Sequence, residues 1–203
     1  MIAWGSWPTL RAWTAPKLAN ASPDCPLPDR AIDDQWPLQT EMKQDHGPWL
    51  IEDIEIRPLA GFSLAGRVLS RETYNYGRES KISPLDLAIG WGPMTKSETI
   101  EQLDITQGGR WYGWRTKENA TIRNKDIIEH SSNMHMIPAN DKIARTLSKV
   151  RAGNRVRLDG WLVEASEPSN PWKWKSSLRR NDTGDGACEV FYVCRVEIEG
   201  SYP

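Results

Sequence analysis

The side chains best suited to acid–base chemistry gather in one short polar segment. Residues 181–189 read Asn-Asp-Thr-Gly-Asp-Gly-Ala-Cys-Glu and carry the carboxyl groups of Asp182, Asp185 and Glu189. The imidazole of His135 lies earlier in the chain, between two methionines. Carboxylates and an imidazole that meet in a fold can act as general acid and base in hydrolysis. A hydrolase site built from these four residues is therefore one hypothesis for the function.

The same segment does not complete a metal site. Residues 181–186 space their oxygen-bearing side chains as a calcium-binding loop does, but Tyr192 stands where such a loop needs a bidentate Glu. His130 and His135 lack the helical i, i+4 spacing of two zinc ligands. The sequence also contains no phosphate-binding loop, dinucleotide-binding glycine motif or nucleophile elbow. We expect no metal and no cofactor, and we interpret 181–186 as a hairpin turn.

The three cysteines do not predict a disulfide framework, because their number is odd and no Cys-x-x-Cys occurs. Cys188 and Cys194 would lie about 20 Å apart on one extended strand, whereas a disulfide needs Cα atoms within about 7 Å. We expect both to be small core residues. Cys25 is then the more reactive thiol.

A set of basic residues around a tryptophan marks a second candidate site. Residues 156–164 and 172–179 each alternate apolar and polar side chains, and the proline-containing connection between them is typical of a hairpin loop. Matching apolar to apolar positions puts Leu162 near Trp174 and Leu158 near Leu178. The opposite face of this hairpin then presents Arg155, Arg157, Trp161, Lys173, Lys175 and Arg179.

This basic face allows two interpretations. Cations around an aromatic ring on an open sheet are how barrel proteins hold single-stranded nucleic acid. Alternatively, the face is solvated and its cations pair with Glu189, Glu197 and Glu199 of the next strand. The whole chain gives no preference for an acidic partner, because 26 Lys and Arg balance 27 Asp and Glu.

Several elements must position these residues. Strands are predicted at 49–56, ended by Pro58, at 62–68, 110–114 and 133–137, and at 188–199. In the last strand one continuous face should point inward: Cys188, Val190, Tyr192, Cys194, Val196 and Ile198. Helices are predicted from Ser83-Pro84 to Gly90, from Thr95 with its capping box, and after the N-cap residue Asn140.

These elements predict an α+β fold that is mostly β. We expect an antiparallel small barrel or curved sheet, OB-like, with two or three short helices. Residues 1–45 carry six prolines and predict a partly disordered arm that Trp4, Trp7, Trp13 and Trp36 could pin in places. Residues 46–203 then form a single β-rich globular domain.

The sequence has no apolar run near the roughly 18 residues of a membrane span and no secretory h-region at its start. A soluble, cytoplasmic protein is therefore the default expectation. An exported or membrane-anchored form is the alternative, if the start is mis-assigned.

Four segments resemble a family of uncharacterised bacterial proteins. They read Ser-Pro-Leu-Asp-Leu-Ala-Ile-Gly-Trp-Gly-Pro-Met (83–94), Gly-Arg-Trp-Tyr (109–112), Ser-Asn-Met-His-Met-Ile-Pro-Ala (132–139) and Ser-Ser-Leu-Arg-Arg-Asn-Asp-Thr-Gly-Asp-Gly-Ala-Cys-Glu (176–189). The resemblance covers roughly residues 50–200. It supports the domain boundary and implies no activity or catalytic residue.

Two functions remain open on these grounds. Eleven tryptophans, the basic face and the missing catalytic motif favour a non-enzymatic binding module. Its partner would be a protein, single-stranded nucleic acid or glycan. The alternative is the hydrolase built from His135 and the 181–189 turn.

Overall fold

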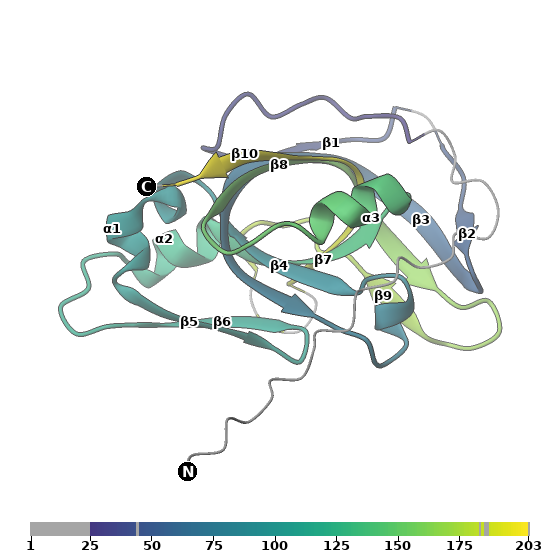
Figure 1. Ribbon diagram of the computed structural model, residues 1–203. Helices are drawn as coiled ribbons and strands as arrows, with labels where there is room; N and C mark the ends of the chain where they lie inside the picture. Colours follow the sequence, from purple (N-terminus) through teal and green to yellow (C-terminus); the bar gives the residue numbers. More distant parts are fainter. Residues whose placement is uncertain (1–24, 44, 183, 185–186, 203) are drawn as a thin grey trace, which may run out of the picture.

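The computed structural model of the chain describes residues 25–43, 45–182, 184 and 187–202. Five strands form a curved, ring-like sheet (Figure 1). They are β3 (Ile54–Thr73), β4 (Leu85–Gly90), β7 (Ser131–Pro138), β8 (Asn154–Ser166) and β10 (Glu189–Ser201). Three short α-helices occur in the described part of the chain. The predicted class, α+β and mostly β with a curved sheet and two or three short helices, is confirmed.

The strands of this ring pair in a cyclic order: β3 with β4, β4 with β7, β7 with β10, β10 with β8, and β8 with β3. Only the β7–β10 pair is parallel. The three predicted strands 156–164, 172–179 and 188–199 do not pair in chain order as a meander. β10 lies between β7 and β8, and β9 (Lys173–Lys175) pairs with the far end of β8.

β3 is long enough to pair with both β8 and β4. Its first part pairs with β8 and its last part with β4. The expected break at Pro58 is wrong, because Pro58 lies within β3 at a register shift, one of the few sheet positions that accept proline. Two short strands flank β3: β1 (Leu38–Thr40) and β2 (Trp49–Ile51).

The inside of the ring is a single apolar cluster to which all five strands contribute. Its members include Phe62, Leu64, Leu87, Ile89, Met134, Met136, Leu158, Leu162, Phe191 and Val193. The helix α3 (Asp141–Leu147) adds Ile143 and Leu147 to this cluster and lies across the ring (Figure 1). The predicted cap is confirmed, since the side chain of Asn140 accepts a hydrogen bond from the backbone N–H of Ile143.

β10 contributes to two cores. Phe191 and Val193 point into the ring, whereas Val190 and Tyr192 join a second cluster outside it. A register shift between Val193 and Arg195 then changes the parity, so that Val196 packs against the inner cluster. The predicted single inward face of residues 188–198 is therefore wrong, because a sheet covered on both sides buries both parities.

The region between β4 and β7 differs most from expectation. The helix predicted over 84–90 is strand β4. The capping-box helix is present as the short α1 (Ser97–Ile100), and a further helix, α2 (Asn124–Glu129), precedes β7. Between them β5 (Leu103–Gly108) and β6 (Trp111–Thr116) form a separate hairpin below the ring (Figure 1).

Residues 25–43 of the predicted arm pack against the domain. β1 pairs with β3, Ala31 is buried, and the indole N–H of Trp161 donates to the carbonyl of Pro26. Cys25 is bonded to Cys194, so the predicted free thiol at Cys25 is wrong. The tryptophans at positions 4, 7 and 13 lie outside the described residues. No helix among the described residues is long and apolar enough to cross a membrane.

Candidate functional site

The β5–β6 hairpin stands over β4 and β7 and closes with a two-residue turn. Gly109 and Arg110 both have positive φ, +58° and +72°, as a type I′ turn requires. This backbone is costly for Arg110, which has a Cβ. Tyr74 compensates: its phenol oxygen accepts from the backbone N–H of Arg110 at 2.9 Å, and the guanidinium lies 3.8 Å from its ring centroid.

The Arg110 side chain ties the hairpin to a buried pair on the ring. Its guanidinium donates to Asp86 at 2.7 Å, and the other carboxylate oxygen of Asp86 lies 3.0 Å from Nδ1 of His135. Asp86 and His135 are direct partners on β4 and β7, and both are buried. The His135 ring packs at 4.5 Å from the Trp174 ring. His135 therefore has a carboxylate partner, but it is Asp86 and not one of the three predicted acids.

Asn133 holds the hairpin at a second point. Its amide donates to the carbonyl of Arg110 at 3.0 Å and accepts from Gln107 at 2.8 Å. The phenol of Tyr112 donates to the hydroxyl of Ser131 at 3.3 Å. β6 is thus fixed in front of the first residues of β7.

A concave pocket opens between β6, α2, the start of β7 and the segment before β10. We call it the β7 pocket. Its volume is about 250 Å³. Its lining residues are Trp111, Tyr112, Trp114, Ile128, Ser131, Ser132, Asn133, Asp182, Gly184, Ala187 and Cys188. Trp111 is 49% exposed, so its indole reaches the solvent at the rim.

A buried acid lies behind the pocket wall. Glu189 accepts hydrogen bonds from Ser132, which lines the pocket, and from Arg180. Burial raises the pKa of Glu189 to about 7, even though the Arg180 charge lowers it. The Arg180 guanidinium lies 5.0 Å from the ring centroid of Phe62 in the inner core. α3 follows the far end of β7, so this polar cluster lies at the opposite end of the ring.

The four predicted catalytic residues do not meet as one group. Glu189 is paired with Met134 and so points to the inner face, whereas His135 points to the outer face. Asp182 lies on the pocket wall, where it accepts from the hydroxyl of Ser177 at 2.6 Å. Asp185 lies outside the described residues.

The pocket also contains a thiol, but an unreactive one. Burial is the main reason that the pKa of Cys188 rises to about 11, and the nearby Glu189 carboxylate adds to the rise. The thiolate is the nucleophilic form of cysteine. Cys188 is therefore protonated at neutral pH and contributes only to the lining of the pocket.

The predicted basic face does not form one patch. β9 pairs its Lys173 and Lys175 with Ser166 and Glu164, whereas Arg155 and Arg157 lie at the other end of β8. The expected contact of Leu162 with Trp174 is wrong, because Trp174 pairs with Ala165. The two groups of cations are roughly 23 Å or more apart along the strand.

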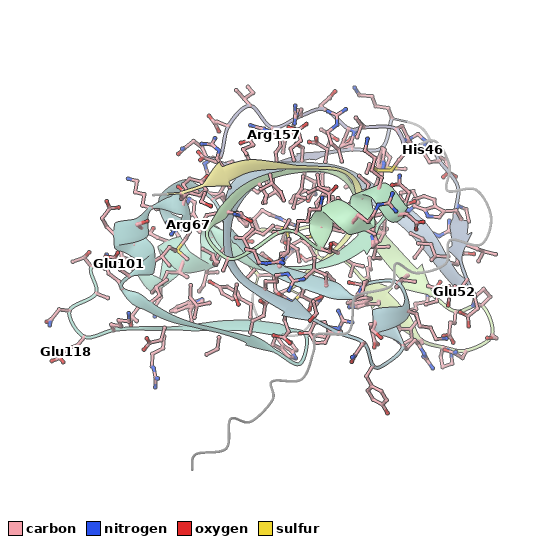
Figure 2. All side chains as sticks on the ribbon, viewed as in Figure 1. His46, Glu52, Arg67, Glu101, Glu118 and Arg157 are labelled. Atoms are coloured by element: carbon pink, nitrogen blue, oxygen red, sulfur yellow. A yellow bond between two sulfur atoms is a disulfide. The ribbon has the colours of Figure 1, made fainter. Side chains whose placement is uncertain are left out.

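The cations of this face are also partly neutralised, and its tryptophan is covered. Arg155 and Arg157 both donate to Glu199, at 2.9 and 3.1 Å, and Lys173 lies 4.0 Å from Glu164. Trp161 is only 7% exposed. Arg179 is exposed on the segment after β9. Figure 2 shows Arg157 above the ring, on the side away from the β5–β6 hairpin.

Sequence reasoning missed most residues of the β7 pocket and its supports: Tyr74, Asp86, Arg110, Trp111, Tyr112, Ser132, Asn133 and Arg180. A signal that points to all of these except Tyr74 is the polar and aromatic content of four segments, 83–94, 109–112, 132–139 and 176–189. These segments are distant in the chain, yet each supplies polar or aromatic residues to the pocket or directly behind it. The described residues hold no cluster of three or more metal-binding side chains.

Comparisons with models of known protein families, with curated proteins and with solved structures find no match to this chain.

Proposed function

We propose that this protein is a non-enzymatic binding module whose ligand enters the β7 pocket. The observation that carries the proposal is the composition of the pocket wall. Three aromatic side chains share a concave space with hydroxyl and amide groups. Behind the wall Arg180 is paired with Glu189, and in the wall the Cys188 thiol is protonated. Asp182 accepts one hydrogen bond, from Ser177. Ligand sites are commonly apolar pockets with a few fixed polar groups.

The strand order supports the same proposal. Numbered in chain order, the ring strands pair as 1-2-3-5-4-1, with strands 3 and 5 parallel and α3 between strands 3 and 4. We propose that this order makes the sheet OB-like. OB-folds bind ligands on the face of strands 2 and 3, beside the loops between strands 1 and 2 and between strands 4 and 5. In this chain those strands are β4 and β7, and the connection from β8 to β10 supplies Asp182 and Cys188 to the pocket.

The alternative hydrolase proposal would depend on Glu189. In its favour, the pKa of Glu189 is about 7 and Ser132, its hydrogen-bond partner, lines the pocket. Against it, His135 points to the other face of the sheet and is engaged by Asp86. The Glu189 carboxylate is also ion-paired with the Arg180 guanidinium.

The disulfide bears on where the module works. Disulfides persist in oxidising compartments and are rare in the cytosol. The Cys25–Cys194 bond therefore favours the exported form over the cytoplasmic one.

Protein-observed NMR with a fragment library of sugars, nucleosides and small aromatic acids tests the proposal. We expect bound fragments to shift the indole signals of Trp111 and Trp114 and the amides of residues 131–133. Trp111→Ala should abolish these shifts, and Ile32→Ala, a change at a side chain that is 95% exposed, should not. Fragments that map elsewhere would contradict the proposal. Turnover of ester or amide substrates that Glu189→Gln abolishes would favour the hydrolase.

A further inference from the structure

We infer that the ligand of the β7 pocket is an uncharged carbohydrate, of which one sugar ring enters the pocket while the rest of the chain passes Trp111. This inference rests on the proposed binding function and names its ligand class. It is carried by the charge, the hydrogen-bonding capacity, the aromatic wall and the size of the pocket.

The charge around the pocket disfavours a phosphate-bearing ligand. No Lys or Arg side chain is among the described residues that line it, whereas Asp182 is. The guanidinium groups nearby are already engaged by carboxylates, Arg110 by Asp86 and Arg180 by Glu189. Single-stranded nucleic acid needs cations along its backbone and therefore fits poorly.

Besides the indole N–H groups of Trp111 and Trp114, the polar side chains of the pocket wall offer a ligand mainly acceptors. Asn133 already uses both its amide nitrogen and its amide oxygen. The phenol O–H of Tyr112 donates to Ser131, and the hydroxyl of Ser131 donates to the carbonyl of Ile127 at 2.7 Å. Neither hydroxyl hydrogen is left for a ligand. In Asp182, Ser177 engages Oδ2, while Oδ1 has no donor among the described residues.

The free acceptors of Tyr112 and Asp182 favour a ligand that brings O–H or N–H donors. The hydroxyl groups of a sugar supply such donors, whereas a phosphate or carboxylate group brings only acceptors. The oxygens of Tyr112 and Asp182 are the groups that we expect to receive them. Leaving a buried acceptor unpaired costs free energy, so the pocket discriminates against anions.

The aromatic wall provides the apolar contact. Trp111 presents half of its surface at the rim, next to Tyr112 and Trp114. The face of an indole carries partial negative charge. The C–H groups on one side of a sugar ring carry partial positive charge and can therefore stack on it.

The size of the pocket limits how much ligand enters. About 250 Å³ is below the roughly 300–1,000 Å³ of pockets for drug-sized ligands. One ring therefore fits inside. An oligosaccharide must continue over the exposed indole of Trp111.

A glycan array that carries neutral and acidic oligosaccharides, probed with the labelled full chain, tests the inference. We expect binding to neutral glycans, followed by quenching of tryptophan fluorescence when the same free oligosaccharide is titrated. Trp111→Ala should weaken this binding by about tenfold or more, as the loss of a stacking surface does. Trp111→Phe should keep part of it, and Ile32→Ala should keep all of it.

The outcomes separate the ligand class from the proposed function. Fragments that bind at Trp111 by NMR, together with no binding to any neutral glycan, would overturn the carbohydrate inference and leave the binding module standing. Salt-sensitive binding of a twelve-nucleotide oligo(dT) that Trp111→Ala removes would overturn it in favour of nucleic acid. No binding at the pocket by any probe would overturn both. Unchanged melting temperatures of the variants show that each loss belongs to the pocket.

Discussion

The Cα atoms of Cys25 and Cys194 lie 5.7 Å apart, and a disulfide joins these residues across 169 positions of sequence. The bond attaches the segment before β1 to the middle of β10, next to Trp49 and Tyr192. The segment between Cys25 and β1 is thus covalently joined to the apolar cluster outside the ring.

Loss of this disulfide should lower stability without abolishing the fold. Cys25→Ser, or reduction, should cost about 2–4 kcal/mol, the usual range for a native disulfide. The melting temperature under non-reducing conditions measures the loss. Cys188→Ser is the matched control, because Cys188 is the unpaired cysteine of the described residues. Alkylation of all three cysteines in unreduced, denatured protein would contradict the bond.

Removal of the Asp86 carboxylate should be strongly destabilising. Asp86→Ala leaves the Arg110 guanidinium and the His135 ring without their shared partner in a buried setting. Breaking one side of a buried ion pair costs about 3–5 kcal/mol. Asp104→Ala is the control, because Asp104 forms an exposed pair with Lys117 at 3.9 Å and should cost at most about 1 kcal/mol. Equal denaturation midpoints for the two variants would refute a structural role for Asp86.

Glu189 should make stability depend on pH. Its pKa is about 7 in the folded protein and near 4.5 as an ordinary Glu, so the folded state holds a proton that the unfolded state releases. The free energy of unfolding should therefore fall as pH rises from about 4.5 to about 7, by about 3 kcal/mol, and then level off.

Glu189→Gln should remove this fall, which urea denaturation at pH 5, 6, 7 and 8 would measure. Glu199→Gln is the control: burial alone would raise the pKa of Glu199, but its hydrogen bonds with Arg157 and Arg155 lower it. Its titration therefore lies below this pH range. The same pH slope in the unmutated protein and in Glu189→Gln would show that Glu189 is charged throughout.

Gly160 should not tolerate a side chain. A Cβ there would collide with the backbone carbonyl of Tyr192 on β10 and lie 3.1 Å from the backbone nitrogen of Cys194. Since a backbone atom cannot move aside cheaply, Gly160→Ala should cost about 2–3 kcal/mol or more. Gly108→Ala is the control, because a Cβ at Gly108 meets no atom within 4 Å. Similar melting temperatures for the two variants would contradict this close approach of β8 and β10.

Local patterns predicted the elements whose cause is local. Asn140 caps α3, and period-two alternation located β8 and β10. Ser83-Pro84 resembles a helix start and therefore predicts a helix where the structure has β4. The alternation of Leu85, Leu87 and Ile89 instead predicts a strand. These three side chains pack in the cluster inside the ring, which stabilises the strand over a helix.

The candidate site was harder to predict, because its partners are distant in sequence. Asp182, Glu189 and His135 were recognisable as single residues. Nothing in their neighbourhood shows that His135 meets Asp86, or that Arg180 meets Glu189. Such pairings, like the Cys25–Cys194 bond, depend on the cyclic order of the strands, which alternation does not encode.

The place of β10 in the ring also has a consequence for how the chain must fold. β10 is the last strand among the described residues, yet it is inserted between β7 and β8. It has a parallel partner on one side and an antiparallel partner on the other. Until residues 189–201 are available, the facing edges of β7 and β8 lack their partner, and the inner cluster lacks Phe191 and Val193. Open strand edges beside exposed apolar side chains favour association with other chains. During synthesis the chain is therefore more prone to aggregation before residues 189–201 emerge than after they have paired with β7 and β8.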